Sequence, residues 1–489
     1  MDNRLPELPL SVLAQYPQPD RKQIQKLLAE ALPHLGRKII VLDDDPTGIQ
    51  TVHDVSVYTD WSCEALRDGF RETSSMFFVL TNSRSFTTDQ TIRVHREIAE
   101  NIAAVSRETE KDFVIISRSD STLRGHFPQE TETLRSVLEE KTGKQYCGEI
   151  LLPFFKEGGR FTIGNVHYVQ DRERLIPAAQ TEFASDKSFG FQSSNLAEYC
   201  EEKTQGAFPA KEVTCIALED LRACRIDKIA KQLEAVSGFG KVVVNAIDYC
   251  DVEVFALAFL RAVSAGKGFI FRSAAALTKV LGGVSDKPVL TKEQLVKPSN
   301  TNGGIILIGS HVNKTTLQLD ELKKSSFHIE FIEFNQHLVL QEGKFAEEVK
   351  RVVSLAEENI CEGKTVAVYT RRDRFDLTSG DEDAQLRVSV EISGALTDVI
   401  GRLTVRPNFI IAKGGITSSD VGTKALHVKR AVVMGQIQPG VPVWMTGSES
   451  KFPDMPYVIF PGNVGETDSL RRIVELLASP VSEGVCGPR

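Results

Sequence analysis

Short apolar runs that lead directly into polar clusters recur along the first part of the chain. Three of them, each four residues long, lie within the first 125 residues: 39–42, 77–80 and 113–116. Four consecutive apolar residues are typical of a strand that is covered on both faces, as in a parallel sheet under helices. Because ligands bind beyond the carboxyl ends of strands in open parallel sheets, the polar clusters are predicted to form a binding site.

Stretches of helical period separate these strands. Asp20 is a good N-cap for a first helix that Gly36 would end, and apolar spacing predicts a second helix over 88–106. Pro128 suits the first turn of a third helix. Further apolar runs extend the series at residues 150–152, 242–244, 269–271, 305–308, 329–334, 365–369, 409–412 and 457–460. This alternation predicts an α/β fold with doubly wound, mostly parallel sheets flanked by helices.

The length of the chain, 489 residues, exceeds what a single core supports. A turn-rich stretch over 282–304 is the best linker candidate. We therefore expect an N-terminal arm and helix over 1–37, a first domain over 38–295 and a second domain over 303–480. The segment 158–211 is less periodic, and we interpret it as an insertion that forms a lid or a dimer contact.

The composition narrows the class of protein. The chain has 58 Lys and Arg against 66 Asp and Glu and lacks a basic stripe, which argues against a nucleic-acid partner. Its eight cysteines are scattered, without the CxxC or short Cys/His spacing typical of zinc sites, so reduced thiols are expected. No apolar run reaches 18 residues, and no signal-peptide pattern opens the chain. We expect a cytoplasmic protein with no membrane partner.

Glycine-rich turns follow three strands of the second half, at 309–316, 413–420 and 461–467. Glycine lets backbone N–H groups approach a phosphate, and the start of a following helix favours negative charge. Three such turns predict a nucleotide site. Alternatively, they are ordinary tight turns, with Thr417 or Ser418 as a helix N-cap. The P-loop motif is incomplete, because its second glycine is absent, and no GxGxxG motif occurs.

The polar clusters of the first half supply arginines and carboxylates. The guanidinium groups of Arg84 and Arg124 match the shape of a carboxylate. Asp44, Asp45 and Asp120 can accept hydrogen bonds from sugar hydroxyls. Adjacent aspartates can also raise one another's pKa, which would suit a general base. These residues therefore favour a site for a small hydroxylated anion.

Other interpretations stay open. The charges could be structural, with Asp43 capping a helix and Arg84 paired to a neighbouring carboxylate. The run from Asp43 to Thr47 also fits the hhhhDxDxT start of haloacid-dehalogenase-like phosphohydrolases, but the acidic run 381–383 follows no strand as metal-binding acids of that class would. A two-domain sensor that closes on a sugar acid without chemistry is the remaining alternative.

Taken together, the clusters resemble the motifs of a known family. Residues 44–48 resemble its DDxTG motif, 81–84 its Thr-x-(Ser/Thr)-Arg motif and 118–125 its eight-residue signature ending in Asp-Ser-Thr-Leu-Arg-Gly. In the second half the matching residues are Gly309 and Ser310 with Thr316 and Gln318, Gly414 to Ser418, and Gly462 to Gly465. The family comprises the ATP-dependent four-carbon acid sugar kinases (DUF1537-type), which phosphorylate threonate, erythronate and oxo-tetronate type substrates. Many relatives carry Glu where this chain has Ile416.

The resemblance implies an N-terminal sugar-acid domain and a C-terminal ATP domain, with ATP and Mg²⁺ required and no metal ligand assigned. The expected catalytic residues are Asp45, Asp120 and Arg124. The expected substrate-binding residues are Asp44, Arg84, Arg118, Asp120, Ser121 and Thr122. The expected ATP-binding residues are Ser310, Gly414, Gly415, Thr417, Ser418, Gly462, Asn463 and Gly465. The choice of general base between Asp45 and Asp120 stays open, as does the formation of a homodimer.

Overall fold

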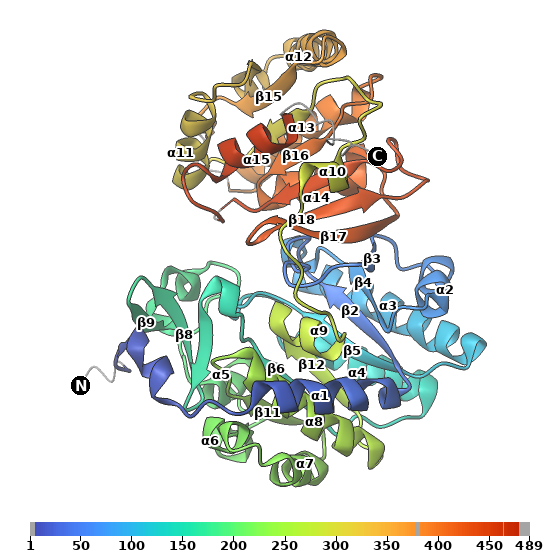
Figure 1. Ribbon diagram of the computed structural model, residues 1–489, viewed down its shortest axis with the longest axis vertical. Helices are drawn as coiled ribbons and strands as arrows, with labels where there is room; N and C mark the ends of the chain where they lie inside the picture. The colour runs from blue at the N-terminus through green and yellow to red at the C-terminus, as the bar shows by residue number, and fades with distance from the viewer. Residues whose placement is uncertain (1–4, 378–381, 463, 479–489) are drawn as a thin grey trace, which may run out of the picture. The chain divides into compact units, whose positions relative to one another are not determined.

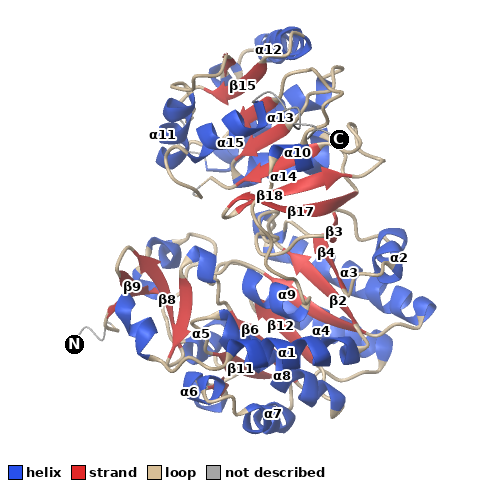
Figure 2. Cartoon of the chain, in the orientation of Figure 1, coloured by secondary structure: helices blue, strands red, loops and turns tan. Residues whose placement is uncertain are grey.

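The computed structural model describes residues 5–377, 382–462 and 464–478. The chain forms two compact units, of which unit 1 ends at Asp286 and unit 2 begins at Lys287 (Figure 1). Each unit contains a sheet between helices (Figure 2). The predicted fold class, two α/β domains with mostly parallel sheets, is confirmed.

The sheet of unit 1 is parallel throughout, since each neighbouring pair of its strands is parallel. In spatial order its strands are β10 (Thr214–Ile216), β11 (Gly240–Val244), β6 (Gly148–Leu152), β12 (Phe269–Ser273), β5 (Phe113–Arg118), β2 (Lys38–Asp43), β4 (Met76–Leu80) and β3 (Val55–Tyr58). Parallel strands end at a common edge, so the polar clusters that follow β2, β4, β5 and β12 meet there.

Helices cover both faces of this sheet, as the uninterrupted apolar runs predict. Every residue of β2 is buried, and Ile40 and Leu42 belong to one apolar cluster with residues of α2, α3 and α4. Helix α8 packs against α1, α7 and α9. The helices of unit 1 are α1 (Arg21–Ala31), α2 (Cys63–Arg71), α3 (Thr88–Thr109), α4 (Gln129–Thr142), α5 (Leu196–Lys203), α6 (Leu218–Arg222), α7 (Ile226–Ala235), α8 (Tyr249–Ser264) and α9 (Ala275–Leu281).

Helix ends follow the sequence signals. The side chain of Asp20 accepts a hydrogen bond from the Gln23 N–H and caps α1, as predicted. Gly143 ends α4 with φ 71°, a conformation that glycine adopts without steric cost.

The segment that follows β6 supplies three strands of a small antiparallel sheet that the sequence did not predict, and a strand near the start of the chain supplies the fourth. Its order is β1 (Leu8–Pro9), β9 (Arg174–Pro177), β8 (Val166–Asp171) and β7 (Arg160–Ile163). Thr162 and Ala246 exchange backbone hydrogen bonds, which ties this sheet to the loop after β11. The interpretation of this segment as a lid or dimer contact stays a prediction.

The sheet of unit 2 combines parallel strands with an antiparallel edge. Its order is β17 (Arg430–Gln438), β18 (Val441–Thr446), β19 (Pro456–Phe460), β16 (Ile410–Lys413), β13 (Ile305–Ile308), β15 (Thr365–Thr370) and β14 (Ile329–Phe334). Its helices are α10 (Lys292–Leu295), α11 (Asn313–Leu322), α12 (Lys344–Cys361), α13 (Glu382–Arg402), α14 (Gly415–Asp420) and α15 (Ser469–Ala478). Strands β17 and β18 were not predicted from the sequence.

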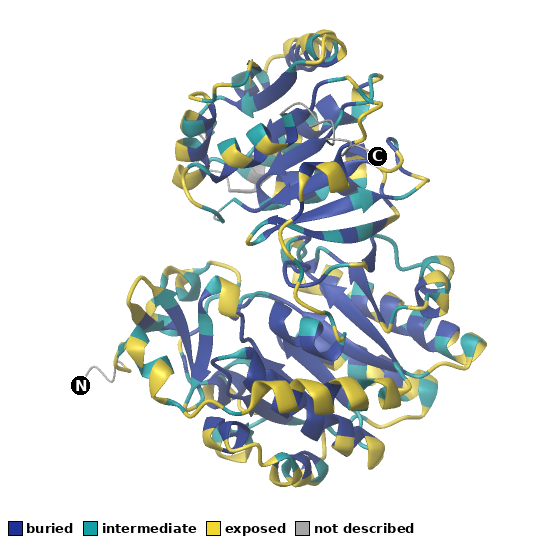
Figure 3. Ribbon diagram, in the orientation of Figure 1, coloured by how far each residue is buried: buried dark blue, intermediate teal, exposed yellow. Residues whose placement is uncertain are grey.

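The central strands of each unit form its buried interior, and the outer helix faces are exposed (Figure 3). None of the helices in the described part of the chain has the length and apolar character needed to cross a membrane.

Candidate functional site

The candidate site of unit 1 begins where β2 and β5 end side by side. Asp43 is the last residue of β2 and pairs in register with Arg118, the last residue of β5. Arg118 Nη1 donates to Asp43 Oδ1 at 3.2 Å, and both side chains are buried. The two expected polar clusters are therefore joined by an ion pair at the carboxyl edge of the sheet.

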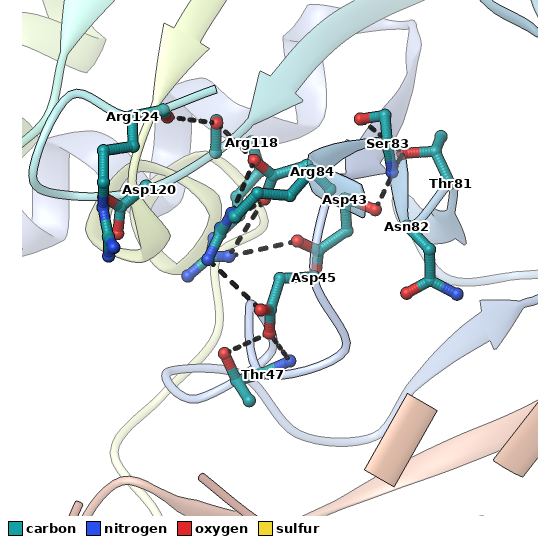
Figure 4. A network of polar contacts seen from close by, with 12 residues as sticks. Asp43, Asp45, Thr47, Thr81, Asn82, Ser83, Arg84, Arg118, Asp120 and Arg124 are labelled. Carbon is teal, nitrogen blue, oxygen red and sulfur yellow. Dashed lines mark hydrogen bonds and ion pairs between the residues drawn. The ribbon is translucent and has the colours of Figure 1, made fainter. Parts of the chain in front are cut away.

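Arg84 links the loop after β4 to the two aspartates that follow β2 (Figure 4). Its Nη2 and Nε donate to the two oxygens of Asp44, at 2.6 and 3.2 Å. Its Nη1 donates to Asp45 Oδ2 at 3.2 Å. Asp45 Oδ1 in turn accepts hydrogen bonds from the N–H and hydroxyl of Thr47. The bidentate pairing with Asp44 fixes the guanidinium plane, and the single bond to Asp45 together with the Thr47 bonds orients the second carboxylate.

A second acidic group lies in the loop after β5. Asp120 Oδ2 accepts hydrogen bonds from Thr122 Oγ1 and from Arg124 Nε, the latter at 2.7 Å. In the described part of the chain, Asp120 Oδ1 has no hydrogen-bond partner. Figure 4 places Asp120 and Arg124 on one side of Arg84 and Asp45 on another. Three of the sequence-predicted residues, Asp44, Asp45 and Asp120, thus lie about the guanidinium group of Arg84.

The aspartates of the site differ in the direction of their pKa shifts. Burial raises the pKa of Asp43 to about 7, although the charge of Arg118 opposes this. Burial would also raise the pKa of Asp45, but Arg84 and the Thr47 hydrogen bonds outweigh it and hold the pKa below its ordinary value. At Asp120 burial is likewise outweighed, and Arg84 and Arg124 hold the pKa well below its ordinary value. Asp45 and Asp120 are therefore ionised at neutral pH.

Two expected substrate-binding residues have their polar contacts within the protein. The Thr122 side chain is fully buried and its hydroxyl faces Asp120. Ser121 is 8% exposed, and its carbonyl oxygen lies 2.8 Å from His167 Nε2. Their direct contact with a substrate stays a prediction.

A buried network that was not predicted from the sequence lies next to the site. Glu130, on α4, accepts hydrogen bonds from Ser83, Ser117 and Arg272, the last at 2.6 Å. Ser119 Oγ donates to Asp44 Oδ2 at 2.5 Å. Arg272 directly follows the predicted strand 269–271, as Arg118 lies in the polar cluster after the run 113–116, so Arg272 could have been chosen as a candidate from the sequence. Glu130 lies in the first turn of a helix, where acidic residues are common, so nothing in the sequence marked it as part of a site.

The glycine turns of unit 2 come together because β13, β16 and β19 are neighbours. Thr315 Oγ1 lies within hydrogen-bond distance, 3.2 Å, of both Ser310 Oγ and the Gly462 carbonyl oxygen, and so joins two of the turns. Gly414 has φ 124°, and a Cβ atom there would lie 3.1 Å from Ser310 Cβ. A side chain at position 414 would therefore crowd Ser310, and glycine there lets the two turns lie close together, as a backbone phosphate cradle requires.

Lys413, the last residue of β16, lies beneath this cradle and was not assigned a role from sequence. Its side chain is fully buried, and Nζ donates to the Pro461 carbonyl at 2.6 Å. The ammonium also lies 3.8 Å from the centroid of the Phe460 ring. Burial lowers its pKa to about 7. Lys413 thereby ties the turn after β19 to the end of β16.

The remaining residues that were expected to bind ATP differ in their surroundings. Thr417 and Ser418 are buried, and Ser418 Oγ donates to the Ala412 carbonyl at 2.9 Å. Gly415 begins α14, and Gly465 lies beside Ser469. Asn463 lies outside the described residues. Their contacts with a nucleotide stay predictions.

Ile416 is 70% exposed at the start of α14, the position where many relatives carry Glu. Of the acidic run considered for a phosphohydrolase, Asp381 lies outside the described residues. Within them, no group of three or more His, Cys, Asp or Glu side chains is arranged to hold a metal ion.

Two family descriptions match the chain, one in each unit. The family described as sugar-binding N-terminal domain matches residues 39–281, and that described as nucleotide-binding C-terminal domain matches residues 305–470. The chain therefore belongs to the four-carbon acid sugar kinase family, which has this two-domain architecture.

Solved structures share the fold over most of the chain. A Haemophilus influenzae protein of the DUF1537 family is 17% identical with a TM-score of 0.59, covering 89% of this chain and 99% of that chain. A Salmonella typhimurium LT2 protein, provisionally described as a tRNA synthase, is 14% identical with a TM-score of 0.63, covering 90% of this chain and 98% of that chain. Identities this low establish the fold alone. No curated protein matches the chain.

Proposed function

We propose that the protein is an ATP-dependent kinase that phosphorylates a hydroxyl group of a small, four-carbon sugar acid. The observation that carries this proposal is the arrangement of Asp45, Arg84, Asp120 and Arg124 around one position on the sugar-binding domain. Carboxylates can orient hydroxyls and arginines can bind an acid group. The glycine turns of the nucleotide-binding domain supply the complementary phosphate site.

The proposed step is transfer of the γ-phosphoryl group. The substrate hydroxyl oxygen bonds to the γ-phosphorus, the bond from that phosphorus to the β,γ-bridging oxygen breaks, and ADP leaves. The hydroxyl proton passes to an aspartate. Asp120 fits best because its Oδ1 accepts no hydrogen bond from the described residues, whereas Asp45 accepts two at Oδ1 and one at Oδ2. Asp45 remains the second candidate.

The protein's contribution would be orientation and charge compensation. Phosphoryl transfer depends mainly on positioning and on neutralising charge, and the depressed pKa values of Asp45 and Asp120 favour hydrogen-bond acceptance over strong basicity. Mg²⁺ would neutralise the phosphate oxygens of ATP. No residue of the chain is assigned to it.

A panel assay tests the proposal and its alternatives. The protein is incubated with ATP, Mg²⁺ and individual four-carbon acids while ADP is followed, with Asp120→Asn as the matched control. Acid-dependent ADP formation supports the kinase. Release of phosphate from sugar phosphates without ATP would instead favour a phosphohydrolase. Acid-dependent melting shifts without turnover would favour a sensor.

A further inference from the structure

Arg160, at the start of β7, carries a guanidinium group whose donors the described residues use only in part. Within the described residues it forms no ion pair, and its Nη1 donates to the Gly158 carbonyl. Its buried Nε has no hydrogen-bond partner. Burial lowers its pKa, the charge of Asp120 opposes this shift, and nearby Arg124 adds to it. A partly desolvated guanidinium with unused donors is costly unless an anion meets it.

Arg124 lies close to Arg160 through a shared aromatic residue. The Cζ atoms of Arg124 and Arg160 lie 4.9 and 5.6 Å from the centroid of the Phe183 ring. Both distances fall within the range of a cation–π contact. Arg124 Nε already donates to Asp120, while its Nη1 has only a loose contact, 3.8 Å, with Asp186 Oδ2. The ring therefore holds two guanidinium groups beside the candidate general base.

The other arginines of the site have less capacity for a ligand. All three nitrogens of Arg84 donate to Asp44 or Asp45. Arg118 Nη1 pairs with Asp43, and the residue is 5% exposed. Their charges are compensated by aspartates of the site. Arg124 and Arg160 are the pair with donors left for an external anion.

We propose that Arg124 and Arg160 form the clamp for the substrate carboxylate, with Phe183 holding both guanidinium groups. This rests on the proposed function. A carboxylate bound there would leave the hydroxylated carbons of the same molecule directed toward Asp120. The segment that contains β7 and Phe183 would then take part in substrate selection. The clamp would favour hydroxy acids over neutral polyols of equal length.

Substitution of Arg160 tests the clamp. Steady-state kinetics compares Arg160→Gln with the unsubstituted protein, using threonate and erythronate as acids and threitol and erythritol as neutral analogues. Removing a charge-assisted hydrogen bond is expected to raise KM for the acids at least about tenfold. KM for ATP and for the neutral analogues is expected to change less than about twofold, because the nucleotide and the polyols make no contact with the clamp. Arg160→Lys keeps the positive charge but loses the planar guanidinium group. Its KM for the acids is expected to lie between those of the unsubstituted protein and Arg160→Gln.

Arg172→Gln is the matched control, since Arg172 is an exposed residue of the β8–β9 turn in the same small sheet. It is expected to behave as the unsubstituted protein. Near-ultraviolet circular dichroism and ATP affinity establish that each variant is folded. An Arg160→Gln variant with unchanged KM for the acids overturns the clamp but leaves the kinase standing. If the unsubstituted protein uses no acid, the proposed function fails, and the clamp fails with it.

Discussion

Gly48 lies so close to Asp43 that a Cβ atom at position 48 would stand 2.1 Å from Asp43 Oδ2. The carboxylate has little room to move, because it is buried and its Oδ1 accepts a hydrogen bond from Arg118. Gly48→Ala is therefore expected to lower the free energy of unfolding by about 1–3 kcal/mol, measured by urea denaturation. Gly394→Ala is the control, because Gly394 has open space in α13 and the substitution should be neutral or stabilising. Equal effects of the two substitutions would contradict this packing argument.

Asp120 is expected to matter for turnover and not for nucleotide binding. Asp120→Asn keeps the shape of the side chain but removes the proton acceptor, so kcat should fall by roughly 10²–10⁴-fold. ATP affinity, measured by calorimetry, should stay unchanged, since Asp120 belongs to unit 1. Asp45→Asn is the comparison that separates the two candidate bases. A fully active Asp120→Asn variant would refute the assignment of Asp120.

The buried carboxyl of Asp43 predicts a pH dependence of stability. Its pKa is about 7 in the folded protein against an ordinary value of 3.8, so the unfolded chain binds fewer protons at this group between these values. Asp43 therefore lowers the free energy of unfolding as the pH rises through this window, and its effect levels off above it. The free energy of unfolding of the unsubstituted protein minus that of Asp43→Asn should decrease from pH 5 to pH 7. A difference that does not change with pH would contradict the raised pKa.

Lys413 is expected to support the nucleotide site from below. Lys413→Met leaves the Pro461 carbonyl without its donor, which should cost about 1–3 kcal/mol of stability and loosen the turn at Gly462. ATP affinity should fall, while affinity for the sugar acid stays unchanged. Lys424→Met removes an exposed lysine that pairs with Asp420, and it should change stability by less than about 1 kcal/mol. An unchanged ATP affinity in the Lys413→Met variant would contradict the expectation that Lys413 stabilises the nucleotide site.

The strands that carry the site could be predicted because both of their faces are buried. In β2 each residue is buried, so the sequence shows an unbroken apolar run. Strand β17 differs, because buried and half-buried positions alternate along it. Its half-buried positions include Val432 and Met434, which are themselves apolar, so the polarity does not alternate with the burial. Period-2 patterning therefore gave no clear signal there.

The candidate site was predictable only where its residues directly follow predicted strands. Asp44, Arg84 and Asp120 lie in such clusters, and the structure brings them together. Glu130 and Arg160 reach the same region from a helix and from the small antiparallel sheet. Their proximity depends on tertiary packing, which the spacing of residues along the sequence does not indicate.

The most direct test of the account is identification of the product. With ATP, Mg²⁺ and the four-carbon acid that gives the most ADP, phosphorus NMR should show a new phosphate ester of that acid, formed in an amount equal to the ADP. ADP that appears together with free phosphate and no ester, for every acid of the panel, would contradict the claim that the protein is a sugar-acid kinase.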